Sequence, residues 1–375
     1  MRIHLLSLLL SVAAVYAVSA QRVWHDPLSA LQACIDGRGW SDELRQSYHR
    51  LPDRFQSVVR PAVWQLAKNS AGLYLNFSTT ATHITVRYVV SEARALNNVV
   101  ALAKSGVDLY RFTPQGQMQW CTCFGRFTMG STPRDTIAFD YQLTAEASQR
   151  RADGTTEPRT YRLYLPLYNT VEWMRIGVDS GEAFTFLPAG SEAPIVCYGT
   201  SILQGASASR PAMAWTNIVQ RTLQRRVVNL GFSGNGLMEP ELFDILAELP
   251  AACYVIDCMP NLSSMPDSIV PRLTRGVHRL RRTTQVPILL VEHDGYNNLY
   301  TDILTRLRYQ RTNKELQHAY RQLLAEGVKQ LYYLGENEIG ISSDEDSQID
   351  GVHANDIGMR RYAQAVMRKL QPLLP

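Results

Sequence analysis

The stretch Ile195-Val196-Cys197-Tyr198-Gly199-Thr200-Ser201 is a short apolar run that ends in a glycine, a threonine and a serine. Such a run is typical of a strand that is buried on both faces of a sheet. Similar runs return along the C-terminal half, at residues 227–230, 253–256, 287–291 and 331–334. Segments with helical apolar stripes lie between or after them, at residues 215–223, 269–280, 313–328 and 359–370. Strands that alternate with amphipathic helices predict a parallel sheet with helices on both faces.

The preceding half of the chain has a different period. Polar and apolar residues alternate from about Trp64 to Phe186, most clearly at residues 72–77, 84–89 and 161–165. A half-buried antiparallel sheet requires this alternation, so we expect an all-β sandwich. Pro188-Ala189-Gly190-Ser191 interrupts the pattern. We therefore predict a sandwich domain at residues 21–190 and an α/β domain at residues 191–375.

The composition supports two folded domains and excludes some functions. The chain has 375 residues, of which 45% are hydrophobic and 19% charged, which argues against long disordered or coiled-coil regions. This length allows about two domains, each large enough to bury its own core. The 38 Lys and Arg against 34 Asp and Glu leave a net charge of +4, spread along the chain. No basic stripe points to a nucleic-acid partner.

Residues 1–20 have the features of a secretory signal peptide. Arg2 gives a positive start, residues 5–18 are almost wholly apolar, and Val18-Ser19-Ala20 supplies small residues before Gln21. An uncleaved membrane anchor is the alternative, but the apolar run is shorter than the ~20 residues that a spanning helix needs. We expect cleavage after Ala20 and a mature protein without a membrane span, exported to the periplasm or the outside of the cell.

The six Cys are too few for a small disulfide-stabilised scaffold. Cys121-Thr122-Cys123 resembles half of a metal site, but no second pair of Cys or His follows at a zinc-like spacing. We therefore expect no bound metal. Cys197, Cys253 and Cys258 lie in or beside apolar runs and are expected to be small buried core residues.

Polar side chains follow the predicted strands at the edge where a parallel sheet binds its ligands. The sequence there contains Gly199-Thr200-Ser201, Gly231-Phe232-Ser233-Gly234-Asn235-Gly236, Asp257-Cys258-Met259-Pro260-Asn261 and, before the last helix, Asp350-Gly351-Val352-His353. A serine becomes a good nucleophile when an imidazole accepts its proton, and an Asp can hold that ring in the correct tautomer. Glycine amides and an Asn amide can stabilise an oxyanion, each donor contributing about a hundred- to a thousandfold in rate. These are the parts that acyl transfer needs.

These blocks resemble those of the SGNH (GDSL-like) hydrolases, whose fold is a flavodoxin-like three-layer α/β/α sandwich. The resemblance implies that Ser201 is the nucleophile, His353 the general base and Asp350 its orienting acid. It implies no metal and no organic cofactor.

The resemblance also implies an oxyanion hole. Its donors would be the backbone amide of Ser201, Gly234 and the side chain of Asn261. Gly231 and Gly236 lie close to Gly234 and are alternatives for the glycine donor.

Two blocks depart from the usual family pattern. Thr200 stands where the family has an Asp, and Met259-Pro260-Asn261-Leu262 stands in place of Gly-x-Asn-Asp. The chain is instead similar to a branch with an extra N-terminal, jelly-roll-like β-sandwich, whose Gly-x-Asp-Leu-Tyr signature appears as Gly106-Val107-Asp108-Leu109-Tyr110. Leu165-Pro166-Leu167-Tyr168-Asn169 is similar to a second element of that domain. We expect Asp108 and Tyr110 to stabilise a turn or an interdomain contact rather than to catalyse.

The function implied by the resemblance is that of an exported serine esterase. Its substrate would be an acylated carbohydrate or another small ester, with acetyl as the favoured acyl group. A lipid esterase, a lysophospholipase or a thioesterase on the same residues is the enzymatic alternative, and a non-catalytic glycan-binding protein is an alternative of another class.

Two histidines have alternative roles. His353 is followed by Asn355 and Asp356, which could cap a helix and leave the histidine as a loop residue. His293, in Glu292-His293-Asp294, also lies at a strand end and could contact the substrate.

Overall fold

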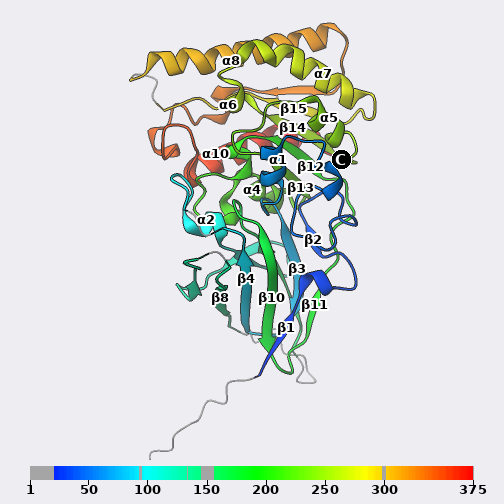
Figure 1. The fold of residues 1–375 in the computed structure, drawn as a ribbon, viewed down its shortest axis with the longest axis vertical. Coiled ribbons are helices and arrows are strands. Elements are labelled where there is room, and N and C mark those ends of the chain that lie inside the picture. The colour runs from blue at the N-terminus through cyan, green and yellow to red at the C-terminus, as the bar shows by residue number, and fades with distance from the viewer. Residues whose placement is uncertain (1–20, 93–94, 133, 145–155, 298–300, 375) are drawn as a thin grey trace, which may run out of the picture.

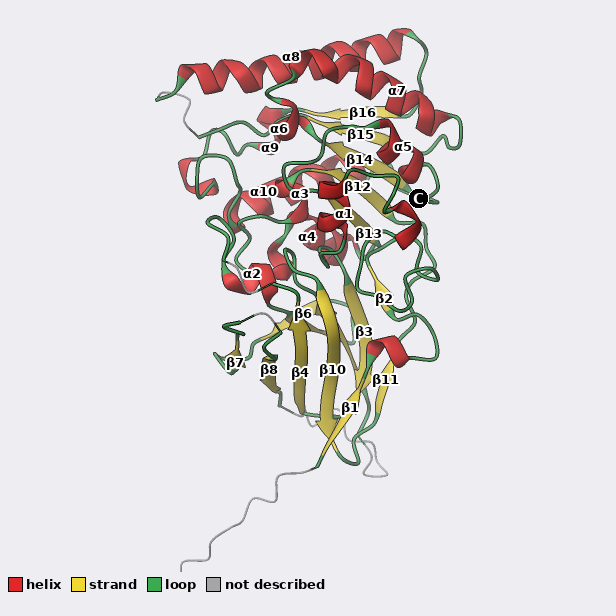
Figure 2. Cartoon of the chain, viewed as in Figure 1, coloured by secondary structure: helices red, strands yellow, loops and turns green. Residues whose placement is uncertain are grey.

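The computed structural model describes residues 21–92, 95–132, 134–144, 156–297 and 301–374, and the predicted signal peptide lies outside this part. Figure 1 shows an elongated molecule, with the strands of a β-sandwich at one end and a sheet flanked by helices at the other. The same two parts are visible when the chain is coloured by secondary structure (Figure 2).

The C-terminal half forms a five-stranded parallel sheet. In spatial order its strands are β13 (Val227–Gly231), β12 (Ile195–Gly199), β14 (Cys253–Asp257), β15 (Ile288–Val291) and β16 (Leu331–Leu334). The second strand in the chain lies on one side of the first and the remaining strands lie on the other. This is the order of the flavodoxin-like fold that the family resemblance implies, and ligands of such sheets bind where the order reverses, beside β12 and β14.

Helices cover both faces of this sheet. One face carries α1 (Pro61–Ala67), α5 (Pro240–Leu246), α7 (Ile269–Arg281) and α8 (Ile303–Ala325), and the other carries α4 (Trp215–Leu223) and α10 (Asp356–Leu370). Within β12, Val196 and Tyr198 pack on the first face, whereas Ile195 and Cys197 pack on the second. Successive side chains of a strand point to opposite faces, so one short apolar run supplies both cores.

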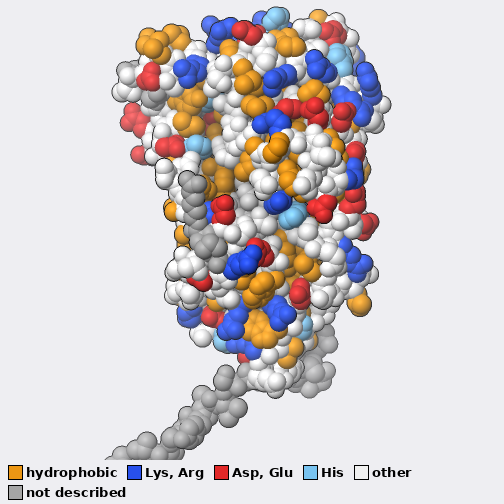
Figure 3. All heavy atoms as spheres, viewed as in Figure 1, with side chains coloured by type: hydrophobic (Ala, Val, Ile, Leu, Met, Phe, Trp, Pro, Cys, Tyr) orange, Lys and Arg blue, Asp and Glu red, His pale blue; other side chains and the backbone are white. Residues whose placement is uncertain are grey.

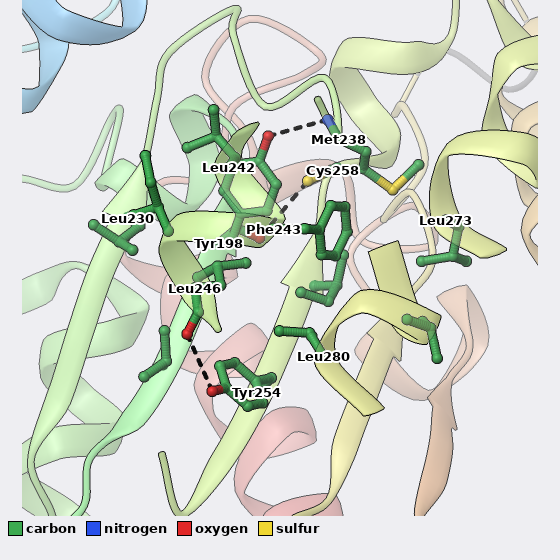
Figure 4. Packing of buried hydrophobic residues seen from close by; sticks show 14 of the residues in the cluster. Tyr198, Leu230, Met238, Leu242, Phe243, Leu246, Tyr254, Cys258, Leu273 and Leu280 are labelled. Carbon is green, nitrogen blue, oxygen red and sulfur yellow. Dashed lines mark hydrogen bonds between the residues drawn. The ribbon is translucent and has the colours of Figure 1, made fainter. Parts of the chain in front are cut away.

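Figure 4 shows the core on the first face, where buried polar atoms have partners. The Tyr198 hydroxyl accepts a hydrogen bond from the Met238 amide at 3.0 Å, and Cys258 Sγ donates to the Tyr198 carbonyl oxygen at 3.8 Å. Cys197, Cys253 and Cys258 are buried, as the sequence predicts. These contacts fix the ends of β12 and β14 beneath the loops that follow them.

The N-terminal half contains the predicted β-sandwich of two antiparallel sheets. One sheet has the order β1 (Arg22–His25), β10 (Val171–Asp179), β4 (His83–Val90), β8 (Ile137–Gln142) and β7 (Phe127–Thr128). The other has the order β11 (Phe184–Phe186), β3 (Tyr74–Thr79), β9 (Arg159–Tyr164), β5 (Asp108–Phe112) and β6 (Met118–Cys121), with β2 (Ile35–Asp36) beside β3. Facing side chains such as Phe77 and Val86 share one apolar core.

Two elements differ from the sequence prediction. Trp64 does not begin a strand-rich region but lies in α1, which packs on the α/β sheet. Helix α8 begins at Ile303 rather than near Asn313. Ile303, Leu304 and Leu307 are exposed there, so this first part of the helix has no inward apolar stripe that a sequence pattern could reveal. The remaining α-helices are short: α2 (Ala101–Ser105), α3 (Ser201–Gln204), α6 (Met259–Leu262) and α9 (Glu336–Ile339).

The Gly-x-Asp-Leu-Tyr segment ties the sandwich to the α/β part. Asp108 is buried, accepts a hydrogen bond from the Ala212 amide at 2.8 Å and pairs with Arg210 at 3.0 Å. Arg210 also donates to the Tyr110 hydroxyl at 3.1 Å. Burial raises the pKa of Asp108, while Arg210 acts in the opposite direction. The expected interdomain contact is confirmed.

A second connection is made by Arg50, which is only 1% exposed. Its guanidinium donates to the carbonyl oxygens of Asn229 and Gly231 at 3.0 and 2.8 Å. Because these carbonyls end β13, Arg50 holds the point from which the glycine loop at residues 231–236 leaves the sheet.

On the face shown in Figure 3, Lys and Arg side chains are interspersed with Asp and Glu. This mixture agrees with the small net charge. Within the described residues, no helix is long and apolar enough to cross a membrane.

Candidate active site

Ser201 is the first residue of helix α3, directly behind β12. Thr200 caps this helix, because its hydroxyl accepts a hydrogen bond from the Ile202 amide at 3.3 Å. Thr is a good capping residue, as is the Asp that the family usually has here, so the departure keeps the local geometry. The Ser201 side chain is buried except for a small part, and its carbonyl oxygen accepts from the Tyr168 hydroxyl at 3.1 Å.

His353 and Asp350 lie in the loop before α10 and reach the same point. His353 Nε2 lies 3.0 Å from Ser201 Oγ, and His353 Nδ1 lies 2.7 Å from Asp350 Oδ2. The other carboxylate oxygen of Asp350 accepts the backbone amides of Val352 and His353 at 3.0 and 2.8 Å. Because Asp350 and His353 are three positions apart, the loop can turn around the Asp350 carboxylate and bring the His353 ring into contact with it.

The surroundings of Asp350 keep it ionised. Burial acts to raise its pKa, but hydrogen bonds from His353 and Val352 outweigh this effect and hold the pKa below its usual value. An ionised Asp350 accepts a hydrogen bond from Nδ1–H, so the ring proton stays on Nδ1 and the lone pair of Nε2 is free to accept the proton of Ser201. The series Ser201, His353 and Asp350 can therefore generate a serine nucleophile.

Gly234 lies on an open part of the glycine loop. Its φ is +69°, a value that favours glycine, and a Cβ added there would meet nothing within 4 Å. Gly231 donates its amide to Asn229 Oδ1 at 2.9 Å, and Gly236 donates to Asn261 Oδ1 at 3.0 Å. In the part of the chain that the structure describes, the Gly234 amide has no acceptor. Of the three glycines, Gly234 therefore has the amide that remains free for a ligand.

Asn261 follows β14 in helix α6 and is partly exposed. Because its Oδ1 accepts from the Gly236 amide, the orientation of the side-chain amide is set and its NH2 group remains available as a donor. The Ser201 amide belongs to the first turn of α3, where backbone N–H groups have no partner within the helix. These three groups are suitable donors for a developing negative charge.

Three residues that support this site were not predicted from the sequence. Gln204 accepts the Ser233 amide at 3.0 Å, and Tyr168 donates to the Ser201 carbonyl. Asn98, from the loop between β4 and α2, places Nδ2 at 3.1 Å from His353 Nδ1. Tyr168 lies in the segment Leu165-Pro166-Leu167-Tyr168-Asn169, whose similarity to an element of the sandwich domain points only weakly to a role at the site. Nothing in the sequence points to Asn98 or Gln204.

His293 is in a different environment. It is completely buried and packs against the rings of Tyr296 and Tyr309, with centroid distances of 4.5 and 5.2 Å. Its backbone amide and Nδ1 are both engaged, by Asn313 and by the Gly295 amide. The structure thus places His293 in the core and not on a surface that a substrate can contact.

A cleft of about 1030 Å³ lies beside the site. Its walls come mainly from the N-terminal half, with Gln46, Gln65 and Asn98 among them, and amide and hydroxyl side chains predominate. Ser233 and Asn235, which flank Gly234, line it from the α/β side. The glycine loop therefore forms one edge of this cleft through the two neighbours of Gly234. No three His, Cys, Asp or Glu side chains of the described residues converge in a way that could hold a metal ion.

Comparison with known proteins gives matches over nearly the whole described chain. Residues 192–371 match the GDSL-like Lipase/Acylhydrolase family, and residues 22–184 match the Gly-x-Asp-Leu-Tyr domain found at the N-terminus of SGNH-hydrolase-type esterases. A comparison with curated protein sequences gives no significant match.

Several solved structures are similar. A protein described as a GDSL-like lipase from Bacteroides ovatus ATCC 8483 is 28% identical, with a TM-score of 0.82 over 94% of this chain and 98% of that one. A salicylyl-acyltransferase from a tetracycline biosynthetic pathway is 15% identical, with a TM-score of 0.66 over 87% of this chain and 89% of that one. A family two carbohydrate esterase from Clostridium thermocellum, in complex with cellohexaose, is 12% identical, with a TM-score of 0.50 over 80% and 91%. The chain belongs to the SGNH (GDSL-like) lipase/acylhydrolase family and is an ester hydrolase with a Gly-x-Asp-Leu-Tyr domain at its N-terminus.

Proposed function

We propose that the protein is an exported serine esterase that removes small acyl groups, acetyl above all, from carbohydrates. The observation that carries this proposal is the continuous hydrogen-bonded series of Ser201, His353 and Asp350 at the end of β12. Export rests on the signal-like sequence of residues 1–20.

The proposed mechanism has two halves. Ser201 Oγ attacks the ester carbonyl carbon while its proton moves to His353 Nε2, and Asp350 stabilises the resulting imidazolium. The bond to the sugar oxygen then breaks, and Nε2 returns the proton to that oxygen. In the second half, His353 Nε2 takes a proton from water while the water oxygen attacks the carbonyl carbon of the acyl-serine. The bond from that carbon to Ser201 Oγ then breaks, Nε2 returns the proton to Oγ, and the carboxylic acid is released.

The negative charge that forms on the carbonyl oxygen needs fixed donors. The backbone amides of Ser201 and Gly234 and the side-chain NH2 of Asn261 supply them in this proposal. The free Gly234 amide and the fixed orientation of Asn261 support this assignment.

The carbohydrate substrate is supported by the cleft beside the site. An acetyl group alone is far smaller than the cleft, so the larger part of the substrate would lie there. The amide and hydroxyl side chains in its walls can form hydrogen bonds with the hydroxyl groups of a sugar. The similar fold of a carbohydrate esterase that was solved with cellohexaose is consistent with this choice.

The first experiment compares the mature protein with Ser201→Ala on a short-chain aryl acetate. Loss of serine attack should lower kcat by about 10⁴-fold or more, because the members of such a triad act as a unit. Ser268→Ala, at a partly buried serine whose hydroxyl donates to the Met265 carbonyl oxygen, is the control. Equal rates for wild type and Ser201→Ala would refute the serine mechanism.

The second experiment tests the substrate. Acetate release is measured on a panel of acetylated polysaccharides, and aryl esters of increasing acyl length are compared in parallel. We expect acetate release and a preference for short acyl groups. A preference for long acyl chains would favour the alternative of a lipid esterase or thioesterase on the same residues.

A further inference from the structure

Asn98 brings the N-terminal domain into contact with the imidazole of the site. It lies between β4 and α2, and its side-chain amide is 3.1 Å from His353 Nδ1, the same nitrogen that Asp350 holds at 2.7 Å. We propose that Asn98 is a positioning residue for His353, so that the sandwich domain completes the hydrolytic site. The proposal rests on the catalytic role of His353 proposed above.

The position of Asn98 is fixed by its neighbours. The carbonyl oxygen of Asn98 accepts a hydrogen bond from Ser207 Oγ at 2.7 Å, and Ser207 lies in the loop that follows α3. Val99, the next residue, is buried in the same apolar core as Ile202 of α3. The loop that carries Asn98 is therefore held by the segment that carries the nucleophile.

The chemistry of the ring decides which atom of Asn98 faces it. Nδ1 has one hydrogen-bonding position, and it carries a proton whenever Nε2 is free to accept from Ser201. An NH2 group cannot donate to a protonated nitrogen. A half-turn of the Asn98 amide places its oxygen there, where it accepts from Nδ1–H together with Asp350.

This arrangement would help in two ways. It holds the plane of the ring from a second direction, and it places a partial negative charge beside the imidazolium that forms when Ser201 loses its proton. Among the described residues, Asp350 is the charged group that contacts the ring, so Asn98 supplies a second, neutral contact. Because Asn98 is neutral, it does not hold the proton on the His353 imidazolium as strongly as a second carboxylate would.

The test replaces this neutral contact by a charged one. In Asn98→Asp, a second carboxylate beside Nδ1 favours the imidazolium, so more alkali is needed to free the base. The acidic limb of the kcat/KM profile on an aryl acetate should move up by about one pH unit. Asn98→Leu, of similar size but without a hydrogen bond, should lose about tenfold in kcat while urea unfolding stays near wild type.

Asn97→Asp is the matched control. Asn97 is exposed and precedes Asn98 directly, so the same charge is added without contact with the ring. Its pH profile should coincide with that of the wild type. The proposal is overturned if Asn98→Asp leaves the profile unmoved, or if both Asp variants shift it equally. Failure of the hydrolase proposal itself would appear separately, as a wild-type rate in Ser201→Ala.

Discussion

Two histidine–aspartate pairs lie in loops of the α/β part, one before α10 and one directly after β15. In the first, His353 Nδ1 is 2.7 Å from Asp350, and Nε2 is 3.0 Å from Ser201 Oγ. In the second, His293 Nδ1 is 3.4 Å from Asp294, and both side chains are completely buried. The first pair is partly open to solvent, and its Nε2 contacts the hydroxyl of Ser201. The Nε2 of His293, by contrast, has no partner among the described residues.

The difference shows what a histidine–aspartate pair needs before it can act as a base. The Gly295 amide donates to His293 Nδ1 at 3.0 Å, so this nitrogen has no proton to give to Asp294. Adjacent residues rarely turn their side chains toward each other, but three residues of loop allow Asp350 to do so. The two pairs combine the same residue types but differ in three ways: the orientation of the Asp toward the ring, the ring nitrogen that carries the proton, and the access of solvent to the ring.

The largest expected effect is the loss of the accessible histidine. His353→Ala removes the proton acceptor of Ser201, so kcat/KM on an aryl acetate should fall by about 10⁴-fold or more. The free energy of unfolding should change by less than about 1 kcal/mol, because the ring is near the surface. Steady-state kinetics and urea unfolding measure the two quantities. If His353→Ala kept most of the wild-type activity, His353 could not be the base that accepts the proton of Ser201.

A smaller loss is expected at the oxyanion donor. Asn261→Ala removes one proposed donor and should lower kcat by about 10²-fold. Asn261→Asp keeps an acceptor for the Gly236 amide but opposes the oxyanion, so its loss should be at least as large. Asn337→Ala, at an exposed asparagine, is the control. Recovery of activity in Asn261→Asp would mean that Asn261 only shapes the loop.

The buried histidine should affect stability rather than rate. His293→Leu leaves the Gly295 amide without its acceptor, which should cost about 2 kcal/mol in the free energy of unfolding. Activity per folded molecule should stay within about threefold of wild type, because the ring lies in the core. His318→Leu, at an exposed helical position, is the control. A large loss of kcat in His293→Leu, with the free energy of unfolding unchanged, would show that His293 takes part in the active site.

Sequence patterns were sufficient for the parallel sheet, because its apolar runs and helical stripes are local signals. They also pointed to the segments with Ser201, Asp350 and His353, because ligands of a parallel sheet bind beyond the carboxyl ends of its strands, and the family resemblance then assigned a role to each residue. They failed for Asn98 and Arg50, whose partners lie far along the chain and follow no spacing rule. Helix α1 was missed for a related reason: it packs on a sheet whose strands come much later in the sequence.

The smallest expected effect on activity concerns Asp257, a buried carboxyl group near Asp294. Asp257 ends β14, is completely buried and accepts the Tyr362 hydroxyl at 2.8 Å. Burial raises its pKa to about 8, and the nearby Asp294 acts in the same direction. The native state therefore holds a proton that the unfolded chain releases above about pH 4, so this group lowers stability as the pH rises toward 8.

Asp257→Asn removes this titration and keeps an acceptor for Tyr362. Relative to the wild type, the variant should gain about 4 kcal/mol in the free energy of unfolding between pH 5 and pH 8, because over this range the native state of the wild type binds a proton that the unfolded chain does not. Urea unfolding at both pH values measures the difference, with the exposed Asp42→Asn as the control. Activity should remain, since Asp257 donates nothing to the substrate. A stability difference that is the same at both pH values would contradict the raised pKa, because only a proton bound by the native state makes the gain depend on pH.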